Sequence, residues 1–113
     1  MRVSLKRIYA WRPKVIQTLE EIRRGRLSYS SDLPVVVSRL DVPRGGLFIV
    51  DGHHRVVEAV LRRARGVDAV VDRYVPWIER TGGAHRGWLE DMVNVSSFVK
   101  TRRVVPGGRV GRG

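Results

Sequence analysis

Residues 51–55, Asp-Gly-His-His-Arg, place several groups able to do chemistry directly after the apolar run at 47–50. An apolar pattern of helical spacing follows them. A strand that ends in Asp-Gly and opens straight into a helix is a geometry that binds phosphate. The first N–H groups of a helix have no partner within the helix, and the helix dipole makes that end positive. The stretch therefore predicts an anion pocket.

Each residue of this stretch has a chemistry that suits such a pocket. Gly52 lets the backbone turn sharply and approach a ligand closely. Arg55, in the first turn of a helix, is disfavoured by the dipole unless an anion compensates it, and its planar fork suits phosphate oxygens. His53 and His54 add donors whose charge can change near neutral pH. Asp51 could accept from a ribose hydroxyl, hold Mg²⁺, act as a base or cap the helix.

The two adjacent histidines are poorly placed to share a metal ion. Neighbouring residues of an α-helix point about 100° apart, whereas two histidines that bind one metal from a helix stand four residues apart. We therefore predict no metal centre held by both His53 and His54. A structural role for either imidazole remains the alternative to a ligand-facing one.

The overall charge indicates a polyanionic partner. The 113 residues carry 22 Lys and Arg against 11 Asp and Glu, a net charge of +11. Such an excess repels itself in a compact fold, and DNA or RNA is the usual partner that relieves it. The absence of cysteine excludes disulfides, zinc-thiolate sites and a Cys nucleophile. No apolar run approaches the ~20 residues of a membrane span, and the first residues lack a signal-peptide core, so we expect a cytoplasmic protein with no membrane partner.

Hydrophobic spacing around the motif predicts a small α+β protein, because alternating runs indicate strands and runs of period 3.6 indicate helices. Proline at a helix start and glycine at a helix end set the expected limits. In chain order the expected elements are a strand at 3–10, a helix from Pro13 to Gly25, strands at 34–40 and 47–50 around a turn at 41–46, a helix with its buried face from Val56 that Gly66 ends, and a last strand at 67–75.

The C-terminal part differs in character. Residues 76–87 are typical of a loop, and 88–100 have apolar residues at roughly helical spacing, which predicts a helix. Residues 101–113 contain four glycines and no acidic residue, so we expect a basic tail that is mobile until it meets a partner. The expected organisation is a core at 1–75, a loop and helix packed on it at 76–100, and the tail at 101–113.

The order of these elements, with the sequences PVVVSRL, LFIVDGHHR and VDAVV in succession, resembles the ParB/sulfiredoxin-like superfamily. The junction DGHHR is closest to the motif of the free-serine-kinase-like branch. The resemblance covers residues 3–74, roughly two thirds of the chain. It implies a small mixed sheet of about four strands with two packed helices, followed here by a C-terminal helix.

The resemblance also implies a nucleotide-phosphate site. Gly52, His53, His54 and Arg55 match the residues that cradle the phosphates of ATP, ADP or CTP in this superfamily, whose known chemistries are phosphoryl transfer, nucleotide hydrolysis and nuclease activity. His53 stands where sulfiredoxins have their catalytic Cys, which rules out sulfinic-acid repair. Val57 stands where ParB proteins have a second motif arginine, which argues against the ParB clamp cycle.

The kinase-like branch also uses a carboxylate from the N-terminal part of the chain. Glu20 and Glu21 are the candidates before Asp32, and the sequence does not choose between them. Both could equally be solvated charges on the helix surface.

Two functional hypotheses follow. In the first, the protein binds ATP or ADP, with Mg²⁺ as a further cofactor, and hydrolyses or transfers a phosphoryl group. Asp51 and His54 would be catalytic in that reaction. In the second, it binds or cuts nucleic acid, with the same pocket holding a DNA phosphate. The expected basic contacts are Arg62, Arg63, Lys100, Arg102 and Arg103, with Trp11, Tyr74 and Trp77 able to stack on bases. A non-catalytic scaffold is a third possibility, and the sequence leaves the oligomeric state open.

Overall fold

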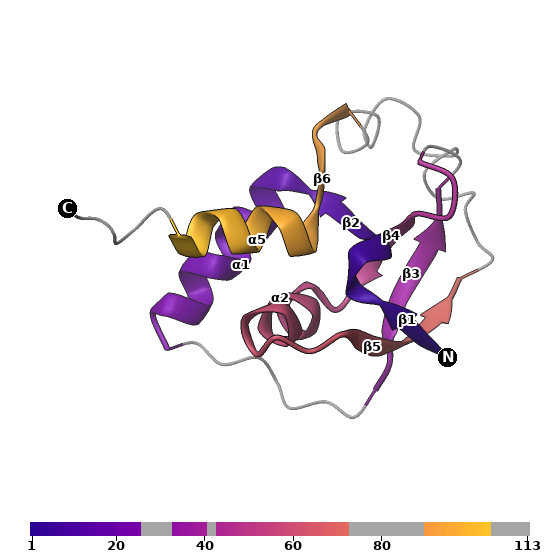
Figure 1. The fold of residues 1–113 in the computed structure, drawn as a ribbon, viewed down its shortest axis with the longest axis horizontal. Helices are drawn as coiled ribbons and strands as arrows, with labels where there is room; N and C mark the ends of the chain where they lie inside the picture. Colours follow the sequence, from indigo (N-terminus) through magenta and orange to yellow (C-terminus); the bar gives the residue numbers. More distant parts are fainter. Residues whose placement is uncertain (26–32, 41–42, 73–89, 105–113) are drawn as a thin grey trace.

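A computed structural model describes residues 1–25, 33–40, 43–72 and 90–104 of the chain. This part is a mixed α+β structure with three α-helices and one six-stranded sheet, as the hydrophobic spacing predicted in outline. Figure 1 shows the helices gathered on one side of the strands. The elements are β1 (Arg2–Ser4), the 3₁₀ turn η1 (Leu5–Arg7), β2 (Ile8–Trp11), α1 (Arg12–Arg23), β3 (Val35–Arg39), β4 (Leu47–Asp51), α2 (His53–Leu61), β5 (Gly66–Val71), β6 (Met92–Asn94) and α5 (Val95–Val104).

The strands follow the spatial order β1-β5-β3-β4-β2-β6. The pairs β1–β5, β3–β4 and β2–β6 are antiparallel, whereas β3–β5 and β2–β4 are parallel. The two strands expected around the turn at 41–46 are therefore present, and they pair with each other in antiparallel fashion. The expected count of about four strands is wrong, because the first predicted strand forms two strands and β6 was not anticipated.

The expected strand at 3–10 is interrupted by η1. The Ser4 hydroxyl accepts a hydrogen bond from the Lys6 amide at 3.2 Å, which caps the turn. Leu5 and Ile8, three residues apart, are both buried, as one turn of a 3₁₀ helix requires. The turn sends β1 and β2 to different parts of the sheet, where β1 pairs with β5 and β2 with β4 and β6.

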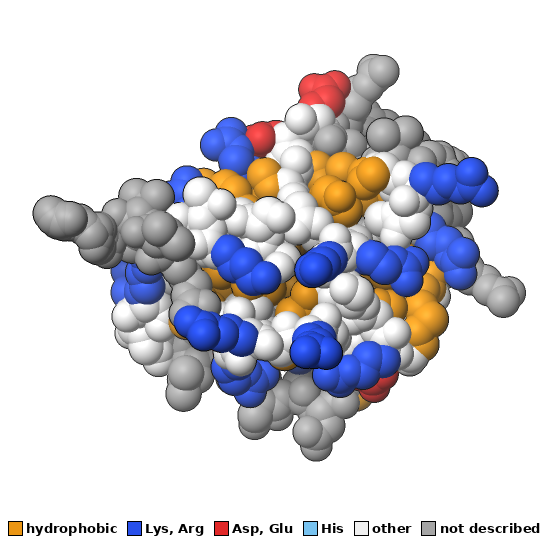
Figure 2. All heavy atoms as spheres, in the orientation of Figure 1, with side chains coloured by type: hydrophobic (Ala, Val, Ile, Leu, Met, Phe, Trp, Pro, Cys, Tyr) orange, Lys and Arg blue, Asp and Glu red, His pale blue; other side chains and the backbone are white. Residues whose placement is uncertain are grey.

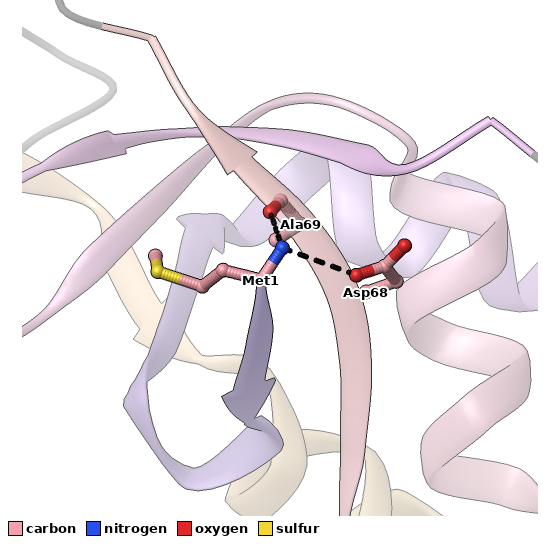
Figure 3. A network of polar contacts seen from close by, with 3 residues as sticks. All are labelled: Met1, Asp68 and Ala69. Atoms are coloured by element: carbon pink, nitrogen blue, oxygen red, sulfur yellow. Dashed lines mark hydrogen bonds and ion pairs between the residues drawn. The ribbon is translucent and has the colours of Figure 1, made fainter.

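The start of β1 is fastened to β5 by three bonds. The amino group of Met1 donates to Asp68 Oδ1 at 3.2 Å and to the Ala69 carbonyl oxygen at 3.0 Å (Figure 3). The Ala69 amide in turn donates to the Met1 carbonyl oxygen at 2.7 Å. These bonds hold an edge strand of only three residues in register.

Helix α1 has the limits that local signals predicted. Pro13 lies in its first turn, where a missing N–H costs nothing. Val15 and Leu19 are buried against the core. Gly25, just beyond the helix, has φ +77°, and its amide donates to the Ile22 carbonyl oxygen at 3.0 Å. This left-handed stop favours glycine.

Helix α2 ends earlier than expected. The amide of Arg63 donates to the Val60 carbonyl oxygen and the amide of Ala64 to the Ala59 carbonyl oxygen, both at 2.9 Å. This is the hydrogen-bond pattern of a left-handed C-terminal cap, and Arg63 occupies its left-handed position with φ +61°. Gly66, expected to end the helix, begins β5 instead. A Cβ at Gly66 would lie 2.6 Å from the Val3 carbonyl oxygen, so the sheet requires glycine there.

The C-terminal part differs from its prediction in two ways. Residues 92–94 form β6 on the edge of β2, although 88–100 was expected to be helical. Helix α5 then continues to Val104, so residues 101–104 belong to a helix rather than to the expected tail. Asn94 caps α5 by accepting from the Ser97 amide at 3.1 Å. Tyr74, Trp77 and the tail from residue 105 lie outside the described residues.

The core lies between the sheet and the helices. Helix α2 contacts both α1 and α5, and its residues Val56, Val57 and Val60 are at most 1% exposed. Val95 and Val99 of α5 belong to the same core cluster. Helix α2 packs against α1, α5 and the strands β3 and β5. These contacts fix the position of its first turn beside α1. None of the helices in the described ranges is long and apolar enough to cross a membrane.

Candidate functional site

The first turn of α2 has no side-chain cap, as an anion site requires. Gly52 is the N-cap residue, with φ +109° and ψ 29°, and among the described residues the helix has no side-chain cap hydrogen bond. The helix begins at His53, so both histidines lie within its first turn. The alternative that Asp51 caps the helix is therefore wrong. A Cβ at Gly52 would lie 3.2 Å from both Cγ atoms of Val35, so glycine is needed here for space as well as for backbone angle.

Helix α1 brings a carboxylate to this turn. Glu21 Oε1 lies 3.7 Å from His54 Nε2, and the two side chains are 25% and 31% exposed. Glu20, the other candidate, is exposed on α1. Of the two candidates that the sequence left open, Glu21 is therefore the one that lies beside His54. The carboxylate can hold the imidazole of His54 in one orientation.

The imidazole of His53 does not titrate near neutral pH, contrary to the expectation from the sequence. The pKa of His53 is lowered from 6.5 to about 4, chiefly by burial and next by the nearby positive charge of Lys14. The Asp51 carboxylate opposes this shift, whereas His54 adds a little to it. His53 is therefore neutral at pH 7 and offers one N–H donor and one acceptor.

Lys14 is a member of this site that the sequence reasoning did not nominate. Its charge acts on His53 from α1, and none of the described ion pairs involves it. Lys14 and Glu21 are seven residues apart, two turns of a helix, and therefore lie on one face of α1. The sequence signal that could have identified Lys14 was this spacing, which puts a cation, an anion and Thr18 on one face of α1.

Arg55 is partly engaged by the protein itself. Its Nη1 donates to the Leu33 carbonyl oxygen. Its Nη2 lies 3.9 Å from Asp51 Oδ2, with side chains 22% and 78% exposed. The guanidinium therefore links the segment before β3 to the junction and has further N–H groups for a ligand. Asp51 remains accessible to a ligand or a cation.

These residues form a cluster of mixed charge at the N-terminal end of α2. Lys14, Arg55 and the positive end of α2 attract an anion, while Glu21 and Asp51 are suited to proton or cation chemistry. Among the described residues no group of three or more His, Asp or Glu side chains gathers to hold a metal ion. The arrangement can bind a phosphate at the α2 amides and move a proton through His54.

The basic residues nominated for nucleic acid lie elsewhere. Arg62 and Arg63 follow the C-terminal end of α2, about 13 Å from the junction for nine residues at ~1.5 Å each. Lys100 and Arg102 are exposed on α5, where the Arg102 guanidinium lies 4.8 Å from the centre of the Phe98 ring. The side chain of Arg103 is outside the described part. The basic residues predicted to contact nucleic acid and the DGHHR junction therefore lie on separate parts of the protein.

No protein-family model, curated protein or solved structure matches this chain.

Proposed function

We propose that the protein binds the phosphates of ATP or ADP at the N-terminus of α2 and hydrolyses or transfers a phosphoryl group. The observation that carries this proposal is the approach of Glu21 to His54 beside uncapped helix amides. A phosphate site alone would need the amides and cations. A positioned carboxylate–imidazole pair adds the means to move a proton.

The resemblance to the ParB/sulfiredoxin-like superfamily supports the same reading. The order α1, β3, β4, α2 and β5 is the order on which the resemblance rests, and the DGHHR residues span the end of β4 and the first turn of α2. The free-serine-kinase-like branch uses a carboxylate from the N-terminal part, and Glu21 occupies a suitable position for that role.

In this proposal the chain's own residues divide the work. The α2 amides, Lys14 and the remaining N–H groups of Arg55 hold the phosphate oxygens. His54, oriented by Glu21, takes the proton of the attacking water or hydroxyl. The attacking oxygen bonds to the terminal phosphorus as the bridging P–O bond breaks, and the nucleoside diphosphate leaves with that electron pair. Asp51 is exposed and could hold Mg²⁺ together with the phosphates, because Mg²⁺ needs only one or two carboxylates when phosphates supply the rest.

Calorimetry with ATP, ADP and AMP, with and without Mg²⁺, tests the proposal directly. We expect ATP and ADP to bind more tightly than AMP, because the site recognises phosphates rather than the base. Phosphate release from ATP should then be measured alone and with candidate hydroxyl acceptors. If the wild-type protein binds none of the three nucleotides, the proposal fails.

A second function, binding of DNA or RNA, is favoured by a separate observation. The net charge is +11, and exposed Lys and Arg side chains form a row across one face of the molecule in Figure 2. Phosphate contacts of this kind give an affinity that falls steeply with salt. Titration of labelled DNA and RNA at several salt concentrations tests it, and an affinity independent of salt would contradict it. Cleavage of the labelled strands should be followed in the same samples.

A further inference from the structure

A pocket of about 860 Å³ lies near the opposite end of α2 from the DGHHR junction. It is formed where η1, the turn after α2 and the first two turns of α5 meet. Its lining includes four basic side chains, Lys6, Arg63, Arg65 and Lys100, and two serines, Ser4 and Ser96. No residue of the junction lines it, and two of its members, Arg63 and Lys100, are among the basic contacts that the sequence predicted.

The walls of this basic pocket are tied together by hydrogen bonds. The Leu5 amide donates to the Arg65 carbonyl oxygen at 3.0 Å, which joins η1 to the turn after α2. Asn94 Nδ2 donates to the Lys6 carbonyl oxygen at 2.8 Å, which joins the start of α5 to η1. Ser96 lines the pocket although it is only 5% exposed. These hydrogen bonds fix the backbone segments from which the four basic side chains extend.

The charge of the basic pocket is uncompensated by the described chain. All four basic side chains are exposed, no acidic residue lines the pocket, and none of the four takes part in a described ion pair. Arg63 is held at φ +61°, a conformation that glycine adopts without strain. Mutual repulsion of four cations on these fixed segments is relieved when an anion binds among them.

We propose that the basic pocket binds the backbone phosphates of a nucleic-acid strand, independently of the nucleotide site at the junction. This inference rests on the second proposed function and assigns its contact residues. A strand is favoured over a free phosphate because the basic row in Figure 2 extends over α5, η1 and the end of α2, beyond the pocket itself. Exposed Arg7 and Arg62 adjoin the pocket residues in sequence and can meet neighbouring phosphates. Lysine and serine contacts to phosphate read no bases, so binding is expected to be largely independent of sequence.

Fluorescence anisotropy with a labelled 20-nucleotide DNA strand at several KCl concentrations tests the assignment. The pocket variant is Lys6→Gln with Arg65→Gln in the full chain. The control variant is Arg24→Gln with Arg39→Gln, which removes the same charge from exposed positions outside the pocket lining. We expect the pocket variant to bind about tenfold more weakly at 0.1 M salt, and the slope of log affinity against log salt to fall by about 1. The control should change affinity by about twofold or less.

Three results would overturn the proposal. The first is equal weakening by the pocket and control variants, which would show an effect of net charge alone. The second is absence of DNA binding by the wild type. The third is displacement of the strand by tripolyphosphate at an equal concentration of phosphate groups, which would make the pocket a site for free polyphosphate. Circular dichroism of each variant checks that the fold is kept. ATP binding should be unchanged in the pocket variant, so failure here and failure at the junction are distinguishable.

Discussion

Glu21 of α1 and His54 of α2 approach to 3.7 Å between Oε1 and Nε2, which joins two helices at the turn where an anion is expected to bind. The two residues are 33 positions apart in the chain, and the sequence around either one does not indicate that the other lies beside it. The pair gives the candidate site a group that can move a proton, which a phosphate-binding turn alone does not have.

Replacement of Glu21 by Gln is expected to lower the rate of phosphate release from ATP by about tenfold, because an amide does not stabilise a protonated imidazole. His54→Ala should cost more, about 100-fold or beyond, since it removes the proton acceptor itself. Glu20→Gln is the matched control on the same helix and should stay within about twofold of the wild type. Equal rates for the two Gln variants would remove Glu21 from the mechanism.

Replacement of Lys14 by Gln is expected to act on His53 and on the ligand together. The Lys14 charge is one cause of the lowered pKa of His53, so the pKa should rise toward 6.5 in the variant. Titration of the histidine ring signals by NMR measures this change. Nucleotide affinity should fall by about fivefold, because one cation near the phosphates is lost. An unchanged pKa together with unchanged affinity would place Lys14 outside the site.

The neutral state of His53 predicts a loss of stability in acid. The unfolded chain binds a proton at His53 near pH 6.5, whereas the folded protein does so only near pH 4. The unfolded state therefore binds more protons between these values, and the free energy of unfolding falls as the pH drops through that window. This difference lowers the free energy of unfolding by about 2 kcal/mol between pH 7 and pH 4.5.

Urea unfolding of the wild type and of His53→Gln at pH 7, 5.5 and 4.5 isolates this contribution. Carboxylates titrate in both proteins, so the difference between the two pH dependences belongs to His53. The wild type should lose about 2 kcal/mol more than the variant across this range. Parallel curves would show that His53 is not neutral in the fold.

Gly52→Ala is expected to destabilise the protein by about 2 kcal/mol or more. A side chain at φ +109° is strained, and its Cβ would also press on Val35 and on Arg55 Nη2, at 3.2 and 3.1 Å. Gly25→Ala is the control, with φ +77° but no atom within 4 Å of the added Cβ. It should cost only about 1 kcal/mol. Thermal unfolding of both variants measures the difference, and equal losses would show that space at Gly52 is unimportant.

Arg63→Gly is expected to stabilise the protein by up to about 1 kcal/mol, because glycine removes the strain of a left-handed residue at a helix end. Arg62→Gly, one position earlier at φ −84°, should be neutral or destabilising because glycine gains nothing there. Chemical denaturation of both variants gives the comparison. A destabilised Arg63→Gly protein would mean that the Arg63 side chain holds the turn.

Local signals predicted those parts of the structure that depend on a few neighbouring residues. Pro13 and Gly25 marked the limits of α1, since helix starts and stops follow from backbone angles and missing N–H groups. The β3–β4 hairpin followed from two β-branched runs around a glycine turn. The split of residues 2–11 was missed, because η1 depends on the Leu5 bond to the distant Arg65. Strand β6 was missed because only the edge of β2 makes those three residues a strand.

For the site, the sequence by itself determined the turn. The sharp turn from a strand into a helix favours glycine at position 52 through its backbone angles alone. The free amides of the first helical turn follow from helix geometry. The tertiary structure alone decided which residues join that turn. The crossing of α1 over α2 brings Glu21 rather than Glu20 to His54 and sets Lys14 near His53. Burial at that crossing then keeps His53 neutral, because the cost of desolvating a charge depends on what packs around it and not on its neighbours in the chain.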